Sequence, residues 1–162
     1  MDEENIYLNY LISDLENYVF LHRKKANNLL SGEKLGREDS LYILEKINKT
    51  LVKVENLLKI LKDVQDVHLK RHICIISSES LSWILFTLPN IEQQLPLFSE
   101  NMRIKGTHLM DMLGEYILLL EEIIEQPKLS LSQYQLLSKK INDISMALGY
   151  IYNMSKRSEE EN

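Results

Sequence analysis

Residues 39–71 read DSLYILEKINKTLVKVENLLKILKDVQDVHLKR, with neither glycine nor proline. Apolar residues recur there at alternating spacings of three and four, which is the seam of a heptad pattern: Leu44, Ile47, Leu51, Val54, Leu58 and Leu61. Acidic residues precede basic ones by four positions in Glu45–Lys49, Glu55–Lys59 and Asp66–Lys70, which supports a helix. The stretch predicts one helix of roughly 50 Å, at ~1.5 Å per residue. It leaves open whether this helix is straight or bends back, and Asp39 or Ser40 is the expected cap.

Similar periodicity predicts long helices over 4–30, from Thr107 to Gln126, and from Ser130 onward, where Gln133 completes a capping box. Between them, the β-branched run at 73–76 predicts a bend. A short apolar helix then ends before Pro89. A further helix begins at Asn90 and runs to about Arg103; Pro96 interrupts it, and Gly106 marks its end. We therefore expect an all-α, single-domain helical bundle of four long helices plus a short apolar crossover of one or two helices. The domain covers 1–156, and 157–162 form a disordered polar tail.

Composition narrows the class of protein. The chain has 162 residues, a net charge of −5 and one cysteine, Cys74, which precludes an intrachain disulfide. The acidic start MDEEN has no apolar signal region, and no apolar run is long enough for a membrane span. These features predict a cytoplasmic protein that does not insert into a membrane. The negative charge weakens any general coating of nucleic acid, which requires clustered lysine and arginine.

Two groups of residues have the types that bind metal ions. His68 and His72 lie four apart, a spacing at which two imidazoles can share a metal, and Cys74 is near. The alternative is a set of cations at a helix C-terminus, where the helix dipole favours them. The helix after Thr107 carries Asp111 and Glu115, which can face one ion or form a solvated acidic face. No cofactor motif is present, and we expect neither a metal nor a cofactor.

Arg103 is followed after four residues by His108, at the expected start of a helix. This short sequence resembles the motif of HEPN ribonucleases, small all-α domains that usually dimerise. The resemblance implies that Arg103 and His108 from two subunits meet at an RNA phosphate, as a cation and an acid/base group. Ile104 stands where the family prefers a polar residue, and Gly106 with Thr107 predicts a loop and a cap within the motif.

Surface chemistry points to binding more than to catalysis. The eight tyrosines offer stacking surfaces but lack interleaved basic residues in the sequence, while Lys46, Lys49 and Lys53 form the best basic face. His22, on an apolar stripe, is expected to be a hydrogen-bonded core histidine. The expected function is a non-enzymatic helical interaction protein, either a homodimer or a small accessory subunit of a larger intracellular assembly, nucleic-acid-processing assemblies included. The alternatives are the HEPN-like ribonuclease and a helical nucleic-acid-binding subunit.

The expected partner-binding residues are apolar side chains near the overhanging end of helix 39–71 and on the crossover: Leu58, Leu61, Val64, Trp83 and Phe86.

Overall fold

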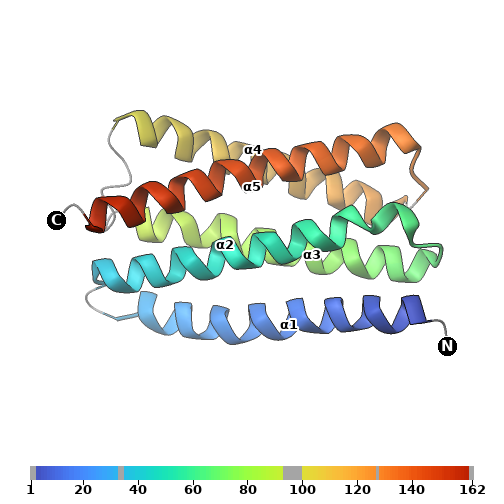
Figure 1. Ribbon diagram of the computed structural model, residues 1–162, viewed down its shortest axis with the longest axis horizontal. Helices are drawn as coiled ribbons and strands as arrows, with labels where there is room; N and C mark the ends of the chain where they lie inside the picture. The colour runs from blue at the N-terminus through green and yellow to red at the C-terminus, as the bar shows by residue number, and fades with distance from the viewer. Residues whose placement is uncertain (1–2, 33–34, 93–99, 127, 161–162) are drawn as a thin grey trace.

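The computed structural model describes residues 3–32, 35–92, 100–126 and 128–160, and all the regular secondary structure within these ranges is helical, joined by turns and short loops (Figure 1). An all-α, single-domain fold is therefore confirmed. The elements are α1 (Glu3–Leu30), α2 (Arg37–Lys59), the 3-10 turn η1 (Leu61–Asp63), α3 (Val67–Glu92), α4 (Glu100–Glu125) and α5 (Leu131–Glu160).

Four of the helices form a closed bundle and the fifth lies against it. Helices α2, α3, α4 and α5 each pack on two neighbours in a ring, with α2 beside α3 and α5, and α4 beside α3 and α5. Successive helices run in opposite directions, as expected for short connections (Figure 1). Helix α1 packs on α2 and α3, and it forms one edge of the molecule. One side of α1 is therefore left facing away from the bundle.

The predicted helix over 39–71 is two helices joined by a tight turn. Helix α2 ends at Lys59, η1 follows, and Val64 is extended, with φ −81° and ψ 122°. Asp66 then caps α3, because its Oδ1 accepts hydrogen bonds from the backbone N–H groups of His68 (2.8 Å) and Leu69 (3.3 Å). The chain folds back here, so no apolar seam overhangs the bundle.

Helix α3 is longer than the expected crossover. It continues through 73–76, where a bend was expected, because Ile73, Cys74 and Ile76 are buried and their packing outweighs the small propensity penalty of β-branched residues. It also continues past Pro89 to Glu92. The expected cap Asn90 is inside α3, where its Nδ2 donates to the carbonyl oxygen of Phe86 at 3.0 Å.

The structure also tests the predicted ends of the other helices. The capping box is confirmed, since the Ser130 N–H donates to Gln133 Oε1 at 2.8 Å. Helix α2 begins at Arg37 after Gly36, and Ser40 Oγ donates to the Gly36 carbonyl, so the expected cap at Asp39 or Ser40 was wrong. Helix α4 starts at Glu100 and runs through Gly106, where an end was expected, while Pro96 lies outside the described residues. Helix α5 extends from Leu131 to Glu160, and the expected division into a domain over 1–156 and a tail over 157–162 stays a prediction.

The core runs along the axis of the four-helix ring. Tyr116 of α4 is 1 % exposed, and its hydroxyl donates to the carbonyl oxygen of Leu137 on α5 at 3.1 Å. The same core contains fully buried leucines and isoleucines from all four helices of the ring, including Leu44, Leu81 and Ile141. Burying each such side chain stabilises the fold by about 1.5–3 kcal/mol relative to exposure. This rigid ring is the scaffold on which the surface features are held.

Candidate functional site

Three aromatic rings lie at the junction of α1 and α2. Tyr18 and His22 of α1 have ring centroids 4.3 Å apart, and the His22 ring lies 6.3 Å from that of Tyr42 on α2. The Tyr42 hydroxyl is 3.3 Å from His22 Nδ1. His22 is therefore hydrogen-bonded as expected, although it is half-buried rather than fully in the core.

Lysines from both helices cover these rings. Lys25 and Lys46 lie 4.4 and 5.1 Å from the centroid of Tyr42, and Lys53 lies 5.0 Å from that of Tyr18, all within the range of cation–π attraction. The view that the tyrosines lack interleaved basic residues was wrong for these two. Each of these lysines comes from the neighbouring helix or from the next turn of the same helix. The order of residues along the sequence therefore does not reveal that they lie over the tyrosine rings.

Charge at this junction is largely balanced. Lys53 is paired with Asp14 of α1, and Lys49 lies 2.8 Å from Glu45. Two of the three lysines of the expected basic face are thus neutralised locally. Burial lowers the pKa of His22 below its ordinary value, and the nearby Lys46 and Lys25 lower it further. Imidazole is therefore the form that this junction favours.

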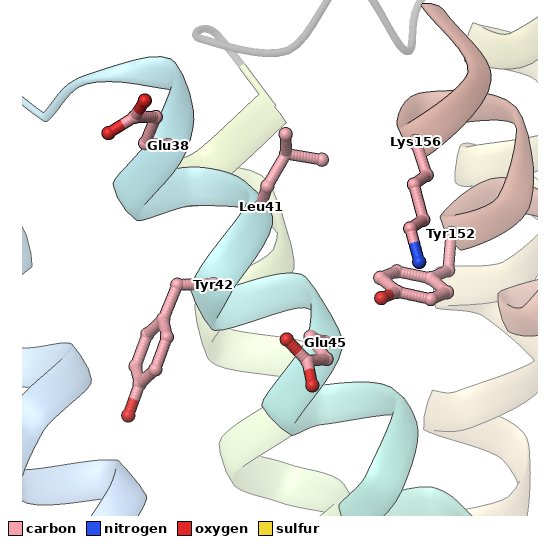
Figure 2. A pocket seen from close by; sticks show the side chains of 6 residues that line it. All are labelled: Glu38, Leu41, Tyr42, Glu45, Tyr152 and Lys156. Carbon is pink, nitrogen blue, oxygen red and sulfur yellow. The ribbon is translucent and has the colours of Figure 1, made fainter. Parts of the chain in front are cut away.

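An open pocket of about 380 Å³ lies between α2 and α5 (Figure 2). In Figure 2, Leu41 and Glu45 face Tyr152 and Lys156 across the opening, while the Tyr42 ring points away toward α1. A hydrogen bond from Lys49 holds the pKa of Glu45 below its ordinary range, and the charge of Lys156 acts in the same direction. Both signs of charge line this pocket, so it does not select one class of charged ligand.

The outward side of α1 exposes five large apolar side chains: Ile6, Tyr7, Tyr10, Phe20 and Leu21. Phe20 is 74 % exposed and Tyr10 is 66 % exposed. Only four described residues of α1 are buried, namely Leu8, Ile12, Leu15 and Ala26. We call the five exposed side chains the α1 outer face. Periodicity over 4–30 does not predict this face, because it places a single apolar stripe against the core. The available signal was that apolar residues occur on both sides of the helix.

The structure places four of the five expected partner-binding residues in the core. Leu58, Leu61, Val64 and Trp83 are each at most 5 % exposed, and only Phe86, at 72 %, lies on the surface. The physical reason is the turn after Lys59, which brings α3 back over the end of α2. Of the five residues, only Phe86 is therefore presented to a partner at the surface of the folded chain.

The residues of the two expected metal alternatives lie on two helices, His68, His72 and Cys74 on α3 and Asp111 with Glu115 on α4. His68 and His72 lie in the first turns of α3, not at a helix C-terminus as the alternative reading held. His72 Nε2 is 3.0 Å from Glu16 of α1. Cys74 is buried, and burial raises the pKa of its thiol to about 12, so it is a poor metal ligand at neutral pH. Among the described residues, no three His, Cys, Asp or Glu side chains group together as a metal site would require.

Arg103 and His108 both belong to α4, which passes through the motif without the expected loop and cap. Five residues on one helix correspond to a rotation of roughly 140° about its axis, so the two positions face different directions. His108 is exposed. Asp111 and Glu115 are exposed on the same helix, as a solvated acidic face would be.

In the described part of the chain, one helix is long and apolar enough to cross a membrane. It is α3, over Val67–Ile91, and 56 % of its most apolar window is buried inside the bundle. That burial is consistent with the core helix of a soluble protein.

Comparison with known proteins relates the chain to others at the sequence level. A protein of Aquifex aeolicus (strain VF5), described as "Uncharacterized protein", is 30 % identical over 156 residues, which cover 93 % of each chain. No solved structure matches the chain. A family model, also described as "Uncharacterized protein", matches residues 8–162, which is nearly the whole bundle. The chain therefore belongs to the family that this model describes.

Proposed function

We propose that this chain is a non-enzymatic helical interaction protein that binds a protein partner through the α1 outer face. It acts as a homodimer or as a small accessory subunit of a larger intracellular assembly. The observation that carries the proposal is that, among its described residues, α1 exposes five large apolar side chains and buries only four residues. Large apolar side chains that gather on one side of a helix and stay in water are a usual mark of a binding site.

Position in the fold supports the same reading. Helix α1 packs on α2 and α3 from outside a ring that is already closed, so its outer side meets no other part of the described chain. Its flanks are fixed by contacts between Asp14 and Lys53 on one side and between Glu16 and His72 on the other. The outer face is thereby held in a defined orientation, and this limits the ordering cost of binding.

The test is isolation of the tagged protein from its native source, with the co-purifying proteins identified by mass spectrometry. Wild type is compared with Tyr10→Glu/Phe20→Glu, which places charges in the α1 outer face. The matched control is Met146→Glu/Leu118→Glu, because these side chains are as exposed but lie on α5 and α4. We expect a stoichiometric partner, either a second copy or another protein, that the first variant loses and the control retains. Equal recovery with both variants contradicts the proposal.

A second candidate, a nucleic-acid-binding subunit, is favoured by the lysines that cover Tyr18 and Tyr42. Aromatic rings and lysines together are the usual elements of a single-strand binding surface. The ion pairs of Lys49 and Lys53 with carboxylates, and the net charge of −5, place it second. It predicts that binding of single-stranded oligonucleotides weakens steeply with salt and is lost in Lys25→Glu/Lys46→Glu. Absence of measurable binding at low salt excludes it.

A further inference from the structure

Three residues of the α1 outer face, Ile6, Tyr10 and Phe20, belong to a stripe with the spacing of packed helices. Ile6, Tyr10, Phe20 and Lys24 are exposed on one side of α1, and the small polar residues Ser13 and Asn17 lie between them. Their spacings of three and four are those of helices that pack lengthwise. The helix is roughly 42 Å long at ~1.5 Å per residue, so this stripe can contact another helix over many turns.

Charge along α1 is divided between its two ends. The sequence of α1 begins with Glu3 and Glu4, and Arg23, Lys24 and Lys25 follow in its second half. The two acids between these ends are already engaged, Asp14 with Lys53 and Glu16 with His72. Arg23 and Lys24 are exposed, and neither forms an ion pair within the described residues. The sequence of α1 is therefore acidic at one end and basic at the other, and the exposed apolar residues lie between in two groups, Ile6 to Tyr10 and Phe20 with Leu21.

A surface with this pattern is complementary to itself when one copy is reversed. Building on the proposed function, we infer that the occupant of the α1 outer face is a second copy of this chain. The two α1 helices pack antiparallel about a twofold axis, with Tyr10 of one copy against Phe20 of the other. This places the acidic end of each helix on the basic end of the other, twice, as a closed twofold interface requires. A parallel pair would place like charges together.

The area of this face determines how strongly the two copies are expected to bind. A strip roughly 42 Å long and about 10 Å wide covers roughly 420 Å² on each copy. A standard stable interface covers about 800 Å² on each partner, so this pairing belongs to the weak and reversible class. The dimer forms as protein concentration rises, and added salt weakens it because its end contacts are charged.

The test uses two charge variants and their mixture, measured by sedimentation velocity over a wide range of concentration. The first variant, Arg23→Glu/Lys24→Glu, has two acidic ends; the second, Glu3→Lys/Glu4→Lys, has two basic ends. We expect wild type to dimerise, each variant alone to need about tenfold more protein, and an equal mixture of the two to associate at least as well as wild type. Lys128→Glu/Lys139→Glu, which changes the charge equally at exposed positions outside α1, should dimerise as wild type does.

Other results overturn the inference. If wild type remains a monomer at every concentration, a second copy is excluded as the occupant. The same conclusion follows if the two charge variants are folded but their mixture does not associate. The proposed function is judged separately: a different protein that co-purifies with wild type, and is lost in Tyr10→Glu/Phe20→Glu, supports it while the antiparallel dimer fails. Sedimentation of monomeric wild type, but not of that variant, with phosphatidylserine vesicles would identify a membrane surface instead. Circular dichroism establishes that each variant is folded.

Discussion

His22 lies where α1 meets α2, hydrogen-bonded to Tyr42 and close to three lysines whose charges oppose its protonation. This environment explains why a histidine on an apolar stripe is a structural residue here. The hydrogen bond was expected from the sequence. The lysines around it were not, because Lys25 is on α1 while Lys46 and Lys49 are on α2, and only the fold brings them together.

Because the pKa of His22 is lower in the folded state than its unfolded value of about 6.5, the unfolded state binds more protons as the pH falls. The free energy of unfolding is therefore greatest above that value and decreases as the pH falls through the folded pKa. We expect His22→Gln to reduce this decrease between pH about 7.5 and about 5.5. Urea unfolding followed by the fluorescence of Trp83, the single tryptophan, measures it. A pH dependence that His22→Gln and the exposed-site control His108→Gln reduce equally would contradict the assignment.

Tyr116 joins α4 to α5 through its hydroxyl, which is buried and bonded to the Leu137 carbonyl oxygen. We expect Tyr116→Phe to lower the free energy of unfolding by about 1 kcal/mol, because the ring is retained while a buried carbonyl loses its hydrogen bond. Tyr10→Phe, at an exposed hydroxyl, should change it by less than about 0.5 kcal/mol. Chemical denaturation of both variants measures the difference. Equal effects would show that this hydrogen bond does not contribute to the free energy of unfolding.

At the scale of elements, the turn between α2 and α3 explains what the sequence could and could not predict. The apolar spacing of α2 continues through Leu61 and Val64 because a 3-10 turn repeats at three residues and both side chains stay buried. Periodicity alone therefore cannot reveal the break. Asp66 carried the signal, since an aspartate can cap a new helix as readily as it can pair with Lys70. The ion pairs Glu45–Lys49 and Glu55–Lys59, inside α2, were predicted correctly.

Asp66→Ala removes the acceptor for two backbone N–H groups at the start of α3. We expect it to lower the free energy of unfolding by about 1 kcal/mol, and Asp66→Asn, which keeps a capping oxygen, to recover most of that loss. Asp63→Ala, in the preceding turn, is the control. Thermal and urea unfolding of the three variants test this, and the same loss in Asp66→Asn would show that the charge, not the cap, is what stabilises α3.

Helix α1 buries four described residues, whereas α2 buries ten. Local opening of α1 should therefore need less free energy than opening of the four-helix ring. We expect its amide hydrogens to exchange faster than those of α2 in dilute protein, as measured by hydrogen–deuterium exchange with mass spectrometry. Uniform protection of α1 and α2 would mean that α1 is part of one cooperative unit with the ring.

At the scale of the molecule, the fold class followed from apolar periodicity, because each long helix must bury one stripe and a bundle is the simplest way to do so. The binding surface did not follow. Leu58 and Leu61 were expected on it because the predicted long helix left them uncovered, and Trp83 because the predicted crossover was almost wholly apolar. The structure buries all three side chains. The α1 outer face becomes visible only once the ring is seen to be complete without that side of α1 (Figure 1).

Site-specific photo-cross-linking in the native source tests the central claim most directly. A benzophenone side chain replaces Phe20, in the α1 outer face, or Met146 on α5, which is similarly exposed. The account predicts a discrete cross-linked product from position 20 that position 146 does not form, with the mass of two copies of this chain if the antiparallel pairing is correct. No product from position 20, or the same products from both positions, would contradict an interface on α1.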